Sequence, residues 1–305
     1  MEAPDSPGLL APIGWVGTAV VGSLERLGAM ALLIPSAVAS IFRREDDAES
    51  GLWAAASAEL WWMLLAGCPL VALVHVAMGS FLSLQAYYGS TFVDGTGAVV
   101  GVGLLRNLAS MMTGLTLAGY LPVRIIFELR ALRRLHRARL AETERSNPAR
   151  GAIDDAHEPT PSPGRLAAAR LLAAVIATPL LSLWGFSVGT LIGWRASETL
   201  MNLPTATFFL MFLRMIWYRD VIGLMIKGAA FGFVIALIAC SEGLRLGEAD
   251  PSPSEAAELV AACRAMLFAS CLAMAAILIM NMTWFVLVYH AVPVYGPSLL
   301  QPPTP

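Results

Sequence analysis

Charged residues are scarce in this sequence. Only 14% of its 305 residues are charged and 57% belong to the apolar set, whereas soluble domains are about one quarter charged. A chain with so few charges could not cover a globular surface with polar groups. It suits a hydrocarbon solvent, in which apolar side chains face outward. The formal net charge of −2 gives no indication of nucleic-acid binding.

Recognisable chemistry is also scarce. The four cysteines lie in or beside apolar stretches, and none forms a Cys-x-x-Cys pair or a Cys/His cluster with metal-ligand spacing. No nucleophile elbow, phosphate loop or zinc signature is present. The first residues lack the basic region of a secretory signal. We therefore expect no catalytic site, no metal, no cofactor and no cleaved signal on this chain.

Long apolar stretches are what the sequence does contain. A helix crosses the hydrocarbon core with about 20 apolar residues. Five stretches meet this length, and together they predict an all-α polytopic membrane helix bundle over residues 58–292. The predicted spans cover about 61–86, 98–127, 166–194, 221–241 and 259–290.

Two other apolar stretches need a different interpretation. Residues 8–42 are interrupted by Glu25, Arg26 and two prolines, which favours an interfacial helix lying along the membrane in an N-terminal region of residues 1–57. Residues 205–218 are aromatic-rich but too short to cross. This pattern predicts a helix at the membrane surface or a re-entrant elbow.

The distribution of arginine predicts the topology. Residues 128–150 are rich in arginine, and Arg43 and Arg44 precede the first span, whereas the loop 87–97 and the tail 293–305 contain no Lys or Arg. Basic loops mark the cytoplasmic side. The N-terminus and the insertion 128–165 are therefore expected inside and the tail outside, which requires an odd number of crossings.

The insertion has two halves of different composition. Residues 128–145 contain helix-forming residues and are expected to prolong the second spanning helix into the cytoplasm. Residues 147–164 are rich in Pro, Asp and Glu and predict a flexible segment. The arginine-rich helix could bind anionic headgroups or contact another protein, and its sequence favours neither.

Charged residues inside the predicted spans are candidates for function. Arg106 and Lys227 are the two deepest. A basic side chain at the centre of a span costs about 2.5–3.5 kcal/mol on insertion scales. Both are therefore expected to face the bundle interior or a cavity, unless they extend to the interface. Arg170 and Arg264, near the starts of their spans, are expected to reach the headgroups.

Three stretches resemble the MlaE/YrbE permease family, the membrane subunit of MCE-type ABC transporters, and the first of them, residues 82–129, contains two of the matching motifs. Residues 84–88 read LQAYY and resemble the family's Leu-Gln-Gly-Tyr-Tyr. Residues 104–108 read LLRNL and resemble its Leu-Leu-Arg-Glu-Leu. Residues 226–245 carry the strongest match, IKGAAFG followed by IALIAC and EGLR. Residues 262–265 read ACRA and resemble Thr-Thr-Arg-Ala at the entry to the last span.

The resemblance implies a transporter assembly. Two permease copies pair in the bacterial inner membrane, ABC ATPase subunits bind ATP beneath them, and MCE-domain proteins assemble on the outer side. The assembly moves lipids, usually phospholipids, between the inner membrane and the periplasmic side. The resemblance also implies a lipid cavity. In this chain Asn107 stands where the family has Glu, and Asn281 stands where the family often has Asp. The implied cavity residues are Arg106, Asn107, Lys227, Asn281, Tyr87 and Tyr88.

The segment that implies ATPase coupling departs from the family. Of the family's Thr-Glu-Gln-Ile-Asp-Ala-Leu, this chain retains Ile153, Asp154 and Asp155, with prolines from Pro159 to Pro163 that disfavour a helix. A non-transporting scaffold, or a degenerate permease half that anchors MCE proteins, is therefore the alternative to an energised permease. A lipid-modifying membrane enzyme ranks below both, because no catalytic constellation is present.

Overall fold

The computed structural model describes residues 11–42, 51–89, 101–146, 162–246 and 255–290, and these residues are almost entirely helical. This confirms the all-α class. The elements in chain order are α1 (Ala11–Phe42), α2 (Leu52–Gly89), the π-helical turn η1 (Leu104–Leu108), α4 (Ala109–Ser146), α6 (Pro163–Met201), α7 (Thr205–Met215), α8 (Tyr218–Arg245), α9 (Glu255–Phe285) and the π-helical turn η2 (Val286–His290).

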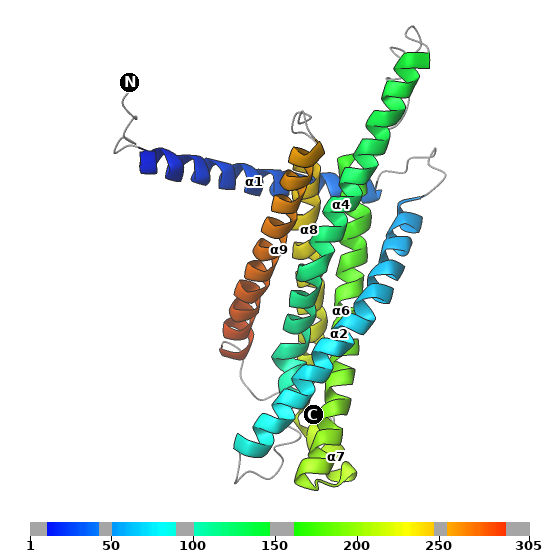
Figure 1. Cartoon of the computed structure of the whole chain (residues 1–305). Coiled ribbons are helices and arrows are strands. Elements are labelled where there is room, and N and C mark those ends of the chain that lie inside the picture. The colour runs from blue at the N-terminus through cyan, green and yellow to red at the C-terminus, as the bar shows by residue number, and fades with distance from the viewer. Residues whose placement is uncertain (1–10, 43–50, 90–100, 147–161, 247–254, 291–305) are drawn as a thin grey trace.

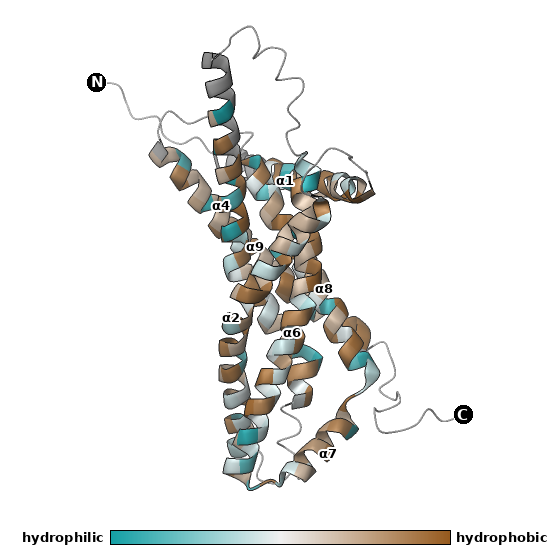
Figure 2. Cartoon of the chain, turned by 90° about the vertical axis from the view of Figure 1, so that its right-hand side faces the viewer, coloured by the Kyte–Doolittle hydropathy of each residue, from teal (hydrophilic) through white to brown (hydrophobic). Residues whose placement is uncertain are grey.

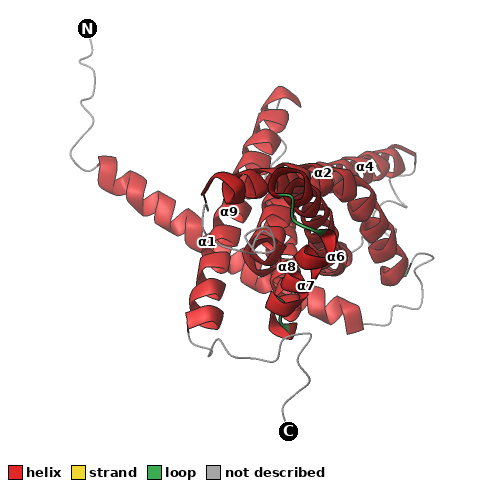
Figure 3. Cartoon of the chain, turned by 90° about the horizontal axis from the view of Figure 1, so that it is seen from below, coloured by secondary structure: helices red, strands yellow, loops and turns green. Residues whose placement is uncertain are grey.

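Long apolar helices form the body of the molecule. Among the described residues, 6 helices are long and apolar enough to cross a membrane, including residues 20–42 of α1. Helices α2, α4, α6, α8 and α9 run alongside one another, whereas α1 lies across them at one end (Figure 1). Viewed along the bundle, α1 extends sideways from the group (Figure 3). The direction of α1 fits a helix that lies along a membrane surface.

The two ends of the bundle differ. Helix α4 continues to Ser146 and leaves the bundle at the end that α1 crosses, whereas α7 lies at the opposite end (Figure 1). The predicted helical extension over 128–145 is thereby confirmed. Hydrophobic residues run along most of the bundle, and hydrophilic residues become more frequent where α4 leaves it (Figure 2). Which end faces the cytoplasm remains a prediction from the arginine distribution.

The outer faces of the bundle expose large apolar side chains. Trp61 and Leu73 of α2 are each 69% exposed, and Leu267 and Ile279 of α9 are 68% and 67% exposed. A water-soluble monomer rarely exposes such extensive apolar faces. Hydrocarbon or a partner helix provides the surroundings these faces require.

Glycines allow α6 to pack closely against its neighbours. A Cβ on Gly79 of α2 would lie 2.5 Å from the Gly189 carbonyl oxygen of α6. A Cβ on Gly232 of α8 would overlap the Ala174 carbonyl oxygen of α6 and approach the Thr178 hydroxyl oxygen to 2.5 Å. Small residues at such positions let membrane helices approach at backbone distance, which maximises their van der Waals contact.

Replacing Gly232 with alanine should therefore destabilise the bundle by about 1–3 kcal/mol, because the added methyl group meets backbone atoms that cannot rotate away. The matched control is Gly28→Ala in α1, where a Cβ has no neighbour within 4 Å. That change should be neutral or stabilising, because alanine is the better helix former. Thermal unfolding in detergent measures both. Equal melting temperatures for the two variants would contradict the close α6–α8 packing.

Candidate functional site

A π-helical turn carries two of the predicted site residues. Arg106 and Asn107 lie in η1, where the backbone N–H of Ala109 donates to the Leu104 carbonyl five residues earlier. Single π-helical turns inside α-helices are frequent at functional sites. This turn places Arg106 against the first turn of α8.

Arg106 is held by acceptors on another part of the chain. Its Nε lies 3.2 Å from Asp220 Oδ2, and its Nη2 donates to the Met215 carbonyl oxygen at 3.0 Å. The Asp220 side chain is fully buried, whereas that of Arg106 keeps 34% of its surface exposed. Asp220 also accepts from the Trp217 backbone N–H at 3.2 Å, and therefore caps α8 while it pairs with Arg106.

Lys227 approaches Arg106 from α8. It is buried, with 2% of its surface exposed, and its Nζ donates to the Arg106 carbonyl oxygen at 2.7 Å. Lys227 and Asp220 are seven residues apart on α8 and so share a face of that helix. The structure thus brings together the two cations that the sequence singled out. Because Asp220 is the third residue of α8, their cluster lies towards the α7 end of the bundle.

The other predicted cavity residues have separate surroundings. Asn281 of α9 is buried, with its Nδ2 3.3 Å from Met111 Sδ of α4, and its Oδ1 has no hydrogen-bond partner among the described residues. Asn107 is half-buried beside Arg106. Tyr87 and Tyr88, near the end of α2, are exposed and form an edge-to-face pair with centroids 4.9 Å apart. The described contacts do not join this pair to Arg106.

Sequence reasoning missed Asp220. The signal was available, because Asp220 is the only acidic residue between Glu198 and Glu242. An arginine at membrane depth requires an acceptor, and an acid two helical turns from a buried lysine was the natural candidate.

The cluster carries more positive than negative charge. Arg219 Nε lies 3.9 Å from Asp220 Oδ1, so two guanidinium groups approach this carboxylate, and Lys227 donates to the Arg106 carbonyl beside it. The Trp217 ring lies 5.8 Å from the Arg106 guanidinium carbon and 4.5 Å from that of Arg219. Such an excess of cations in apolar surroundings favours binding of an anionic group.

A second charge cluster joins α2, α4 and α6 towards the opposite end. Arg124 Nη1 lies 3.1 Å from Glu59 Oε2, and Arg124 also pairs with Glu128 one turn later. Arg170 Nη2 lies 3.6 Å from Glu59 and 3.4 Å from Glu128. The expectation that Arg170 extends to the headgroups is therefore wrong. Its side chain is only 6% exposed, because carboxylates from two other helices meet it inside the bundle.

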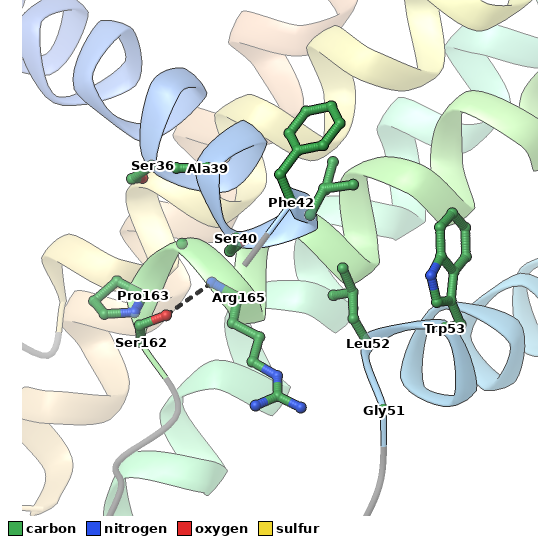
Figure 4. A pocket seen from close by; sticks show the side chains of 12 residues that line it. Ser36, Ala39, Ser40, Phe42, Gly51, Leu52, Trp53, Ser162, Pro163 and Arg165 are labelled. Carbon is green, nitrogen blue, oxygen red and sulfur yellow. Dashed lines mark hydrogen bonds between the residues drawn. The ribbon is translucent and has the colours of Figure 1, made fainter. Parts of the chain in front are cut away.

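A cavity of about 920 Å³ opens where α1, α2 and α6 meet. Figure 4 shows Phe42, Leu52 and Trp53 on one side and the first turn of α6 on the other, where Ser162 Oγ accepts from the Arg165 backbone N–H. Pro163 is the first residue of α6, a position that proline favours. The predicted coupling residues Ile153, Asp154 and Asp155 lie outside the described residues.

Part of this chain is similar in sequence to membrane permeases. Residues 160–287 match the family model described as permease MlaE, a segment that includes Asp220, Lys227 and Asn281 but not Arg106. A probable ABC transporter permease protein of Rickettsia typhi is 26% identical over 183 residues, which is 59% of this chain and 65% of that protein. The corresponding protein of Rickettsia prowazekii is 27% identical over the same shares. The match therefore spans slightly less than two thirds of these relatives.

Proposed function

We propose that this multi-pass membrane chain, which is similar to the MlaE permease family over residues 160–287, is the membrane subunit of an ABC transporter for phospholipids. It moves lipid between a bacterial inner membrane and the periplasmic side. A separate ATPase subunit binds ATP and supplies the energy. A second permease copy and MCE-domain proteins complete the assembly.

The observation that carries the lipid assignment is the cluster around Arg106. A phospholipid has a phosphate that requires cationic donors and two tails that require apolar surroundings. Arg106, Arg219 and Lys227 supply the cations, and Asp220 supplies a carboxylate that pairs with the two arginines. The cluster is embedded in an apolar bundle at one end, where a headgroup can reach it.

Arg106 can bind phosphate without leaving Asp220. A guanidinium has five N–H donors, and the contacts to Asp220 and Met215 engage its Nε and Nη2. The exposed third of the side chain offers remaining donors to an incoming anion. Asp220 and the Met215 carbonyl hold the guanidinium plane in place, which lowers the entropy cost of binding.

The opposite end is the proposed docking side for the ATPase. It combines the crossing helix α1, the arginine-rich extension of α4 and the cavity between α1, α2 and α6. The cluster of Glu59, Arg124, Glu128 and Arg170 joins three spanning helices towards this end. A movement that the ATPase imposes at this end would therefore move α2, α4 and α6 together.

Removing cations from the Arg106 cluster should reduce the phospholipid that co-purifies with the protein. Lys227→Met should weaken lipid binding about tenfold, because a hydrogen bond to a charged group contributes about 1.5–3 kcal/mol. The double variant Arg106→Gln/Asp220→Asn should also lower the lipid content, because it removes the Arg106 cation together with the carboxylate that pairs with it. Phosphorus analysis per mole of folded protein measures this.

The matched control is Arg195→Gln, because Arg195 is exposed and pairs with Glu198 outside the cluster. It should retain the wild-type lipid content. Size-exclusion profiles separate lost lipid from lost folding. Wild-type lipid content in both cluster variants would exclude this cluster as the lipid site.

A non-transporting scaffold is the second candidate. The observation that favours it is the run of prolines 159, 161 and 163 in the segment where the family resemblance implies a coupling helix. A scaffold would retain MCE-domain proteins and lipid but recruit no ATPase.

A further inference from the structure

A basic pocket lies between α1, α8 and α9, away from the Arg106 cluster. Its volume is about 830 Å³, and its lining includes Arg26 of α1, Glu242 and Arg245 of α8, and Arg264 of α9. Lys227 and Arg245 are 18 residues apart on α8, which corresponds to about 27 Å along the helix. Because the hydrocarbon core is about 30 Å thick, the pocket lies at the opposite membrane surface from the Arg106 cluster.

The charges of the pocket are unbalanced. Glu242 Oε1 lies 3.7 Å from Arg26 Nε and 3.4 Å from Arg245 Nη1, and its side chain is only 7% exposed. Two guanidinium groups therefore share this nearly buried carboxylate, and Arg264 adds a third guanidinium to the lining of the pocket. Arg26 and Arg245 keep 35% and 33% of their side chains exposed, and Arg264 is exposed. Their free surfaces can receive an anion.

The pocket also has an apolar wall. The Arg26 guanidinium carbon lies 3.9 Å from the centroid of the Phe268 ring, a cation–π contact that fixes α1 against α9. Val260 and Phe268 remain 52% and 37% exposed along α9. An acyl chain bound here would follow α9 towards the hydrocarbon, while its phosphate remained with the arginines.

The geometry points to a second lipid site: we propose that this pocket binds the phosphate headgroup of an anionic phospholipid in the membrane surface that α1 follows. Guanidinium groups suit phosphate because they donate paired hydrogen bonds in a fixed plane. The adjacent Glu258 does not cancel this charge, because Arg134 Nη2 binds it at 2.8 Å and Arg130 Nη2 lies 3.6 Å away. A bound lipid would hold α1, α8 and α9 together at this end.

The test uses the full chain in phosphatidylcholine nanodiscs into which phosphatidylglycerol is titrated, with bound lipid counted by native mass spectrometry. The variant is Arg245→Gln/Arg264→Gln, which leaves the Arg26–Glu242 pair intact. Phosphatidylglycerol binding should weaken about fivefold for each arginine removed, the order expected for a basic residue at an anionic surface. Arg195→Gln, at the other end of the bundle, should bind as wild type.

The measurement is repeated in the Lys227→Met background, so that the lipid proposed at the Arg106 cluster does not enter the difference. If Arg245→Gln/Arg264→Gln fails to fold, Arg245→Lys/Arg264→Lys takes its place. Because lysine keeps the charge but loses the planar fork, that variant should bind more weakly than wild type but still prefer phosphatidylglycerol. Equal phosphatidylglycerol binding in wild type and the glutamine variant would overturn the proposal. Displacement of the lipid by inorganic phosphate at equal concentration would also overturn it, because the pocket would then recognise free phosphate.

Discussion

Replacing Arg170 with methionine is expected to lower the free energy of unfolding by about 3–5 kcal/mol, the range for removing one partner of a buried charge cluster. Arg170 faces Glu59 and Glu128, and its Nη1 also donates to the Leu166 carbonyl oxygen at 3.0 Å. Without Arg170, Arg124 alone would have to compensate both carboxylates inside the bundle. Chemical or thermal unfolding in detergent measures the loss.

Arg195→Met is the matched control for this change. Arg195 pairs with Glu198, but its side chain is 59% exposed, and exposed pairs contribute about 0–1 kcal/mol. Adding Glu59→Gln to Arg170→Met should recover part of the stability, because it removes the carboxylate left without a partner. Similar losses for Arg170→Met and Arg195→Met would contradict a structural role for the cluster.

Replacing Asp220 with alanine is the second substitution for which we expect a large loss in the free energy of unfolding. It removes the carboxylate that pairs with Arg106 and caps the first turn of α8. The expected loss is about 3 kcal/mol, at the lower end of the range for buried pairs because Arg106 is 34% exposed. The melting temperature in detergent should fall accordingly, and lipid content should change even in the molecules that remain folded.

A double-mutant cycle isolates the Arg106–Asp220 contact. The paired variant Arg106→Gln/Asp220→Asn should lose less stability than the sum of its single changes, because neutral amides can replace the ion pair. Glu198→Ala serves as the control at the exposed Arg195–Glu198 pair. Additive losses in the cycle would show that Arg106 and Asp220 do not interact.

The fold follows from the sequence because hydropathy determines most of it. A continuous apolar stretch of spanning length must be helical in hydrocarbon, since every backbone polar group has to be satisfied internally. The helix-forming residues after 127 indicated the extension of α4, whereas the interfacial position expected for residues 8–42 stays a prediction, because residues 20–42 are also apolar enough to cross a membrane. These predictions need only local sequence.

The partners of the charged residues could not be predicted in the same way. Arg106 and Asp220 are separated by 114 positions, and hydropathy does not tell which faces of two distant helices meet. Arg170 was misplaced for the same reason. Its position near the start of a span suggested the headgroups, whereas the acids that hold it come from α2 and α4. The π-helical turn at Arg106 also has no sequence signal comparable to proline in a kink.

The two charge clusters lie towards opposite ends of the proposed permease and suit different roles. Cations at the α7 end are suited to a lipid headgroup, and the charge network nearer the α1 end joins α2, α4 and α6. In the proposed transporter, the chain would supply lipid binding and mechanical connection, and the ATPase partner would supply the energy at the end where α4 leaves the bundle.

Purification of the full chain from its native membrane in mild detergent, followed by mass spectrometry of proteins and lipids, tests the transporter assignment most directly. The account predicts that an ABC ATPase subunit, MCE-domain proteins and phospholipid are recovered with the chain. Recovery of MCE-domain proteins and lipid without any ATPase would contradict an energised permease and identify the chain as a scaffold.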